Sequence, residues 1–190
     1  MSALRNLLFA ALVITLLSCA TDEPVTMRLD PSWSEEDVAT FEYDARSWNA
    51  ETIPSAQIVF TTNGEWYVEH ADPMVRLRAS GLTREQIFAL EGRPDLADNP
   101  AAYLGGWTFG RERLIQIWPS EVPGSVHSIA LHEFGHALKL RHTKTGVMSV
   151  DNPPPAALVD YALTSEDIEE CRRAGSCRGA RGGVTVISAR

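Results

Sequence analysis

Apolar residues recur at helical spacing early in the chain. The positions on this face are Val38, Phe41, Ala45 and Trp48. Because side chains three or four residues apart lie on one side of a helix, the pattern predicts an amphipathic helix over residues 34–49. Ser34 precedes Asp37 by three residues, which is the spacing of a capping box at a helix N-terminus.

Short runs of β-branched and aromatic residues predict the strands of a sheet. These runs lie at residues 56–61, 66–70, 75–79 and 114–118. The turn dipeptide at Asn63 and Gly64 indicates that the second run lies beside the first.

Further helices are predicted between and after these strands, at residues 83–90, 125–138 and 165–174. The first ends near Gly92 and Pro94, and the last begins at Thr164, with Asp167 three residues later as a capping partner. Residues 153–155 are three prolines and form a rigid break. Strands interleaved with helices, within 190 residues, predict one α+β or α/β domain.

The N-terminal residues have the pattern of an export signal. Arg5 is followed by an apolar run over residues 7–17, too short for a membrane-spanning helix of about 20 residues. Cys19 follows this run directly, in an arrangement that resembles the lipobox of bacterial lipoproteins. The resemblance implies that residues 1–18 are a cleaved signal peptide, that Cys19 is lipidated and that residues 19–31 form a tether.

The remaining cysteines fit an exported protein. A plain signal peptide cut near Ala20 is the alternative to lipidation, and would leave Cys19 without a role. Cys171 and Cys177 remain as an even pair, and disulfides persist outside the reducing cytosol. We therefore expect a Cys171–Cys177 disulfide, with two free thiols as the alternative.

The charge of the chain limits its partners. Loss of residues 1–18 removes one cation and no acid, which changes the formal net charge from −8 to −9. An acidic protein does not bind nucleic acid through its overall field and is repelled by anionic lipid headgroups. We expect a monomer that is exported and held at the bacterial cell envelope, at the outer membrane or cell surface, by its lipid anchor alone.

One segment of the predicted helix at residues 125–138 carries metal chemistry. His132 and His136 are four residues apart, so a helix presents both imidazoles on one face to one ion. Glu133 points about 100° away and can act on a metal-bound water as general base. His142 can join the other two histidines only if the helix ends near residues 138–140 and the chain turns back.

This His-Glu-x-x-His-x-x-x-x-x-His spacing, followed by Met148, resembles the metzincin zinc metallopeptidases, in particular the matrixin-like branch. The resemblance implies Zn²⁺ held by His132, His136 and His142, with Met148 in the Met-turn beneath them. The family has glycine at the position of Lys139. Because that glycine relaxes a left-handed turn, lysine there should cost on the order of 1 kcal/mol unless the turn takes another path.

The resemblance also implies a fold. It has a twisted mixed sheet with an antiparallel edge strand, an active-site helix, and a small C-terminal subdomain with the Met-turn and a last helix. Residues 106–109 are the candidate edge strand, which would bind an extended protein or peptide substrate by strand addition. The catalytic domain would span residues 32–177, followed by a loose tail at residues 178–190.

The expected activity is that of a zinc-dependent metalloendopeptidase in which Glu133 is the general base. One alternative is a zinc-stabilised envelope lipoprotein or binding module without turnover. Another is a thermolysin-like ligand set, in which Glu166 or Glu169 replaces His142. No residue that we can name from the sequence sets the cleavage specificity.

Overall fold

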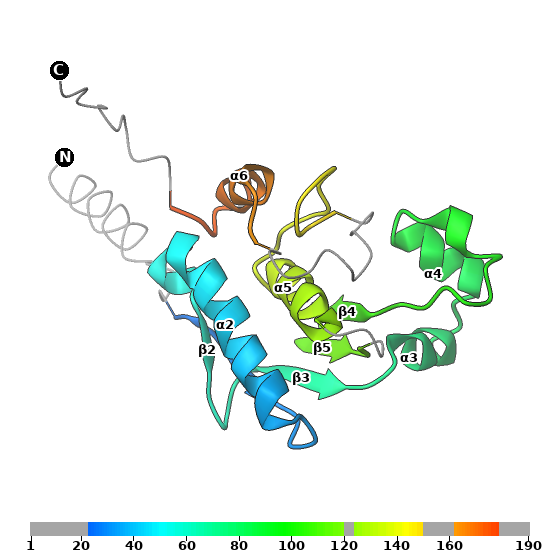
Figure 1. Cartoon of the computed structure of the whole chain (residues 1–190), viewed down its shortest axis with the longest axis horizontal. Helices are drawn as coiled ribbons and strands as arrows, with labels where there is room; N and C mark the ends of the chain where they lie inside the picture. Colours follow the sequence, from blue (N-terminus) through cyan, green and yellow to red (C-terminus); the bar gives the residue numbers. More distant parts are fainter. Residues whose placement is uncertain (1–22, 120–123, 150–161, 179–190) are drawn as a thin grey trace, which may run out of the picture.

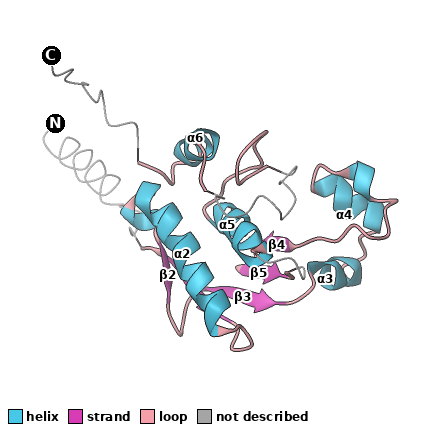
Figure 2. Ribbon diagram, viewed as in Figure 1, coloured by secondary structure: helices cyan, strands magenta, loops and turns pink. Residues whose placement is uncertain are grey.

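Within residues 23–119, 124–149 and 162–178, which the computed structural model describes, the chain forms a five-stranded, mostly parallel sheet with helices packed on it (Figures 1 and 2). The strand order is β2-β1-β3-β5-β4, and only β4 runs antiparallel to its neighbour. The strands are β1 (Val25–Leu29), β2 (Ile58–Phe60), β3 (Trp66–His70), β4 (Gly106–Phe109) and β5 (Leu114–Ile117). The predicted α+β class and the antiparallel edge strand at residues 106–109 are confirmed.

Two long helices cover one face of this sheet. Helix α2 (Glu35–Glu51) and helix α5 (Ser125–Ala137) run side by side across it (Figure 1). The buried side chains between the helices and the sheet include Met27, Phe41, Trp48, Val68, Ile115, Ile117, Leu131 and Phe134. Inside this main core, the Trp48 indole N–H donates to the Leu131 carbonyl at 2.9 Å, which fixes the two helices against each other.

The capping residues predicted at the N-termini of two helices are confirmed. Ser34 and Asp37 form a reciprocal capping box at the start of α2. The last helix, α6 (Ser165–Arg173), begins with the same motif from Thr164 and Asp167. Helix α4 (Arg84–Leu90) begins at Thr83, close to where the sequence placed it.

The N-terminal tether expected at residues 19–31 is wrong for its second half. Val25–Leu29 is strand β1, which lies in the sheet between β2 and β3 and pairs in parallel with both. Met27 is fully buried in the main core. A five-residue strand has too weak a pattern to stand out in the sequence, and its stability comes from two neighbours that are distant in the chain.

Two further expectations about strands are wrong. Residues 75–79 belong to helix α3 (Pro73–Ala79), which starts with Asp72 as N-cap and proline at its first position; these start signals outweigh the alternating pattern. The predicted strand at residues 66–70 exists as β3, but it does not lie beside β2, because β1 separates them.

The helices α3 and α4 form a second, smaller core apart from the main one. Its buried members are Met74, Leu77, Ile87, Phe88, Ala97 and Leu104, and Trp107 and Phe109 of the edge strand pack against it. The loop after α4 is tied to the helix by Arg84, whose guanidinium donates to three backbone carbonyls at 2.6–2.8 Å. The acceptors are those of Ala97, Asn99 and Ala102.

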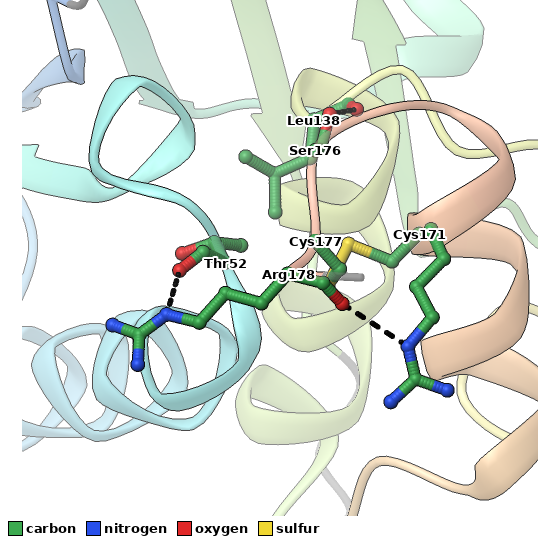
Figure 3. The surroundings of a disulfide bond; sticks show 7 residues. Thr52, Leu138, Cys171, Ser176, Cys177 and Arg178 are labelled. Atoms are coloured by element: carbon green, nitrogen blue, oxygen red, sulfur yellow. Dashed lines mark hydrogen bonds between the residues drawn. A yellow bond between two sulfur atoms is a disulfide. The ribbon is translucent and has the colours of Figure 1, made fainter. Parts of the chain in front are cut away.

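A disulfide between Cys171 and Cys177 closes the turn after α6, as expected. Figure 3 shows how the residues around it reach the rest of the domain. The Ser176 hydroxyl donates to the Leu138 carbonyl at the end of α5, and the Arg178 guanidinium donates to the Thr52 carbonyl at the end of α2. The C-terminal turn therefore joins the ends of both long helices.

Some expectations fall outside the described residues. They are the signal peptide with Cys19, the three prolines at residues 153–155, and the tail from residue 179 onward. Among the helices that the structure describes, none combines the length and the apolar character needed to cross a bilayer.

Candidate metal centre

Three imidazoles converge at the C-terminal half of α5. The ligand atoms of His132, His136 and His142 all lie within 4.8 Å of one another. The Nε2 atom of His136 is 3.0 Å from that of His132 and 3.1 Å from that of His142. Ring nitrogens gathered this closely could hold a metal ion, and the sequence predicted these three residues.

Backbone carbonyls set the orientation of the two helical histidines. His132 Nδ1 donates to the Val147 carbonyl at 2.7 Å, and His136 Nδ1 donates to the Leu140 carbonyl at 2.9 Å. A carbonyl only accepts, so the proton must be on Nδ1 and the lone pair on Nε2. The nitrogens that could bind a metal ion are thereby held in a fixed direction.

Burial keeps the imidazoles neutral. The pKa of His132 is lowered to about 3 and that of His136 to about 4, chiefly by burial and in smaller part by the neighbouring histidines. The pKa of the half-buried His142 is also lowered by burial. A neutral imidazole with a free Nε2 lone pair is the form that binds metal ions.

The turn that brings His142 back is a helix C-terminus with lysine where glycine is usual. The Leu140 N–H donates to the Gly135 carbonyl at 3.0 Å, and the Lys139 N–H donates to the His136 carbonyl at 2.9 Å, the two bonds of a Schellman motif. Lys139 has a φ of +69°, so it adopts the left-handed conformation despite its Cβ. The turn does not take another path, and the expected strain is present.

Met148 is fully buried and packs against α5. A Cβ on Gly135 would collide with the Met148 sulfur and would also meet the Trp48 ring at 3.1 Å. Because Gly135 has no side chain, Met148 and Trp48 can pack directly against the backbone of α5 between His132 and His136. Met148 therefore packs against the segment of α5 that carries His132 and His136.

Asp167 is the residue that holds the Met148 segment, and the sequence suggested only its capping role. Its fully buried carboxylate accepts from the Val147 N–H at 3.0 Å and the Met148 N–H at 2.9 Å. Because Val147 in turn accepts from His132, helix α6 supports a metal-binding histidine through two hydrogen bonds in series.

Glu133 is buried beside the three imidazoles. Burial raises its pKa to about 8, the negative charge of Glu91 acts in the same direction, and a hydrogen bond from Thr108 opposes both. The Thr108 hydroxyl donates to Glu133 Oε2 at 2.7 Å. A Cβ on Gly106 would lie 2.6 Å from Glu133 Oε1. The edge strand therefore contacts this carboxyl through the backbone of Gly106 and the hydroxyl of Thr108. Neither contact could be predicted from the local sequence pattern.

A pocket of about 360 Å³ opens beside these groups. It is lined by Leu90, Glu91, Trp107, Thr108, Gly110, Glu133, His136 and His142. Glu91, which terminates α4, has one carboxylate oxygen 3.9 Å from His142 Nε2. Burial raises the pKa of Glu91 to about 7. Nothing in the local sequence around Glu91 indicates this location.

The other polar residues considered from the sequence are used elsewhere. Glu166 accepts hydrogen bonds from the backbone of Lys144 and Thr145 at 3.2–3.3 Å, and neither Glu166 nor Glu169 is in the converging group. The thermolysin-like ligand set thus has no support within the described residues. His127 lies with its Nδ1 2.5 Å from a carboxylate oxygen of the buried Asp44, between α5 and α2.

The donor set itself fits a metal ion. It consists of three imidazole nitrogens that lie within 4.8 Å of one another, and imidazole suits late first-row divalent ions. An adjoining carboxyl and an open pocket leave room for a substrate beside that point. No model of a protein family matches the sequence, and no curated protein is similar enough to it to count as a relative.

Proposed function

We propose that this protein is a zinc-dependent endopeptidase of the metzincin kind. The observation that carries the proposal is the buried Glu133 carboxyl beside three converging imidazoles, at the edge of a pocket. A site that only stabilised the fold would need four ligands and no neighbouring acid. The strand order, with the antiparallel β4 at the edge, agrees with the architecture that this family resemblance implies.

His132, His136 and His142 would hold the ion. Zinc in such a site polarises a scissile carbonyl and lowers the pKa of a water molecule toward about 7. The protein's own part is to present neutral ring nitrogens, to hold the rings of His132 and His136 in a fixed direction through backbone carbonyls, and to keep bulk water away from His132 by burial.

Glu133 is the proton carrier in this proposal. Its carboxylate accepts a proton from the attacking water and donates it to the leaving amine. A pKa raised by burial makes Glu133 a stronger base than an exposed glutamate, which suits this exchange. The hydroxyl of Thr108 holds one oxygen, Oε2, so the other is free to face the reacting atoms.

The edge strand β4 would bind the substrate backbone. The Trp118 N–H donates to the Gly105 carbonyl at 2.7 Å, so the backbone of Gly105 faces β5. Since this direction alternates along an antiparallel strand, the backbone groups of Gly106 and Thr108 face outward. Among the described residues no strand pairs with that edge, and an extended peptide could add there.

The substitution Glu133→Gln tests this function. It removes the proton carrier and keeps the shape of the side chain, so we expect one zinc per chain in both proteins, with peptide hydrolysis at least about 10²-fold slower in the variant. Zinc content is measured on the purified protein, and hydrolysis on a peptide library. Full activity in the variant would refute the role of Glu133. Stoichiometric zinc without turnover in the wild type would instead favour a binding module.

We also infer that the protein is exported and anchored through lipid on Cys19. The Cys171–Cys177 disulfide supports export, because such bonds persist outside the reducing cytosol. Mass spectrometry of the mature protein from a bacterial host should show acyl chains on Cys19. Cys19→Ala should then release the domain from the membrane fraction.

A further inference from the structure

A carboxylate that peptide hydrolysis does not require lies in the metal pocket. Glu91 lines the same pocket as Glu133, and the end of α4 there meets Trp107 and Thr108 of the edge strand. Its side chain is 23% exposed, and one of its oxygens is 3.9 Å from His142 Nε2. Glu91 is not a member of the group whose ligand atoms converge. It therefore lies next to the metal-binding atoms and faces the space that a substrate would occupy.

The position of Glu91 is fixed by the fold. Its backbone N–H donates to the carbonyl of Ile87 at 3.2 Å, and Arg93 N–H donates to the Phe88 carbonyl at 2.8 Å just beyond it. Ile87 and Phe88 are buried in the second core. Glu91 thus stands on a supported helix end and not on a free loop.

The side chains described around Glu91 include no lysine or arginine that pairs with its carboxylate. Among the described residues, none donates a hydrogen bond to its carboxylate, and His142 is the one basic side chain within 4 Å. That ring nitrogen of His142 already belongs to the group of converging imidazoles. The end of a helix carries the negative pole of the backbone dipole, which makes an acid there unfavourable. Burying a charge without a partner is also unfavourable.

The walls on either side of Glu91 are apolar. Leu90 is 61% exposed and Trp107 is half-buried, and both line the same pocket. A long side chain with a methylene stem and a cationic head could lay the stem along Leu90 and the Trp107 ring and direct its head to Glu91.

We propose that Glu91 and the walls formed by Leu90 and Trp107 make a subsite for a cationic group of the substrate next to the scissile bond. The inference rests on the proposed peptidase function and names the substrate class of the same site. The cation is the ammonium or guanidinium head of a lysine or arginine side chain, or the free N-terminal ammonium of the substrate. A basic side chain would leave the protein an endopeptidase, and the N-terminal ammonium would make it an aminopeptidase.

The experiment compares cleavage of matched peptides by the wild type, Glu91→Gln and Glu85→Gln. Glu85 lies in the first turn of the same helix and is exposed, so its variant makes the same change of charge outside the pocket. The peptides carry lysine or its uncharged analogue norleucine at each position in turn, with free or acetylated N-termini. We expect Glu91→Gln to lower the preference for the cationic peptides at least about tenfold, as loss of one charge-assisted contact would. Glu85→Gln should keep that preference.

The acetylated peptides separate the two sources of the cation. A preference that survives acetylation and follows lysine assigns the subsite to a basic side chain, and a preference lost on acetylation assigns it to the N-terminal ammonium. An unchanged cleavage profile in Glu91→Gln, with zinc retained, would overturn the proposal. So would a loss of zinc affinity in that variant, because Glu91 would then be a metal ligand.

A binding measurement separates this proposal from the peptidase function itself. If the wild type cleaves no peptide, the peptidase function fails, and calorimetry on the zinc-loaded protein still tests the subsite. Lysine peptides that bind at least about tenfold more tightly than norleucine peptides, but only when Glu91 is present, would support it. Equal binding of both peptides would overturn it.

Discussion

The two walls of the metal pocket rest on cores of different size. One wall is α5, whose buried face belongs to the main core between the sheet and α2. The other is the end of α4, held by the smaller core of the α3–α4 pair. The first wall carries the imidazoles and Glu133, and the second carries Leu90 and Glu91. The helix that carries two of the three converging imidazoles is thus built on the larger core.

The hydrogen bonds at the two walls differ in the same way. His132, His136 and Glu133 each have a hydrogen-bond partner that fixes the direction of the side chain. Glu91 has no such donor among the described residues. The side chains of the first wall are thus held in place by the fold itself, and under the proposed function a bound cation would supply the partner that Glu91 lacks.

Phe88→Ala should produce the largest change, and it tests whether the two walls are independent. Phe88 is 2% exposed in the second core, so its truncation should cost about 3–5 kcal/mol within the α3–α4 pair. We expect amide hydrogen exchange to accelerate across residues 73–104 and the preference for cationic peptides to be lost. Zinc content should remain at one per chain.

Phe41→Ala is the matched control in the main core. Phe41 is fully buried and packs edge-to-face on Trp33, with ring centroids 4.9 Å apart. Its truncation should accelerate exchange in α5 and lower zinc affinity together. If Phe88→Ala also released zinc, the two walls would be one cooperative unit and the comparison would fail.

The next largest effect concerns pH and Asp44, a buried acid of α2 that contacts His127 of α5. Asp44 is fully buried between α2 and α5, and burial raises its pKa from 3.8 to about 6, although His127 opposes the rise. The folded protein therefore binds more protons than the unfolded chain between these values. The stability that protonated Asp44 contributes is complete below about pH 4 and is lost as the pH rises to about 6, by up to about 3 kcal/mol.

Asp44→Asn should remove this loss. The free energy of unfolding of both proteins is measured with urea between pH 4 and 7. The difference between the two values should change across that range. Asp98→Asn makes the same substitution at an exposed position and should follow the wild type. A difference that stays constant with pH would show that Asp44 does not titrate there.

The first wall was readable from the sequence because its geometry is local. Helical periodicity alone places His132 and His136 on one face, and the spacing to His142 requires the turn that the structure contains. The same is true of the capping boxes at Ser34 and Thr164, whose partners lie three residues away.

The second wall was not readable because it depends on contacts between distant segments. The segment at residues 75–79 alternates like a strand, yet it folds as a helix against α4. Glu91 reaches the metal pocket only because that pair stands beside the edge strand. Thr108 is likewise 25 residues from Glu133 in the chain, and no local pattern links them. Strand β1 was missed for the same reason, since its partners are β2 and β3.

A smaller effect is expected where the edge strand touches the first wall. In Gly106→Ala the new Cβ would lie 2.6 Å from Glu133 Oε1 and 2.7 Å from the Ile129 side chain. We expect a loss of about 1–3 kcal/mol in stability, with Glu133 displaced and hydrolysis reduced more than zinc affinity. Gly110→Ala is the control, because it lines the same pocket and its Cβ would meet nothing within 4 Å. Equal kinetics in both variants would argue against the contact.

Lys139→Gly should give the smallest change and tests how much strain the first wall contains. Lys139 has a φ of +69°, and removing its Cβ should relieve on the order of 1 kcal/mol. Glycine also gives the unfolded chain more freedom, which offsets about 0.4–1 kcal/mol of that gain. The melting temperature should therefore rise by no more than about 2 °C, with zinc retained. Arg113→Gly is the matched variant away from the metal, because Arg113 is exposed in the turn before β5 and also has a positive φ, of +51°. Loss of zinc in Lys139→Gly, but not in Arg113→Gly, would contradict this expectation. It would show that the Lys139 side chain helps to place His142 for metal binding.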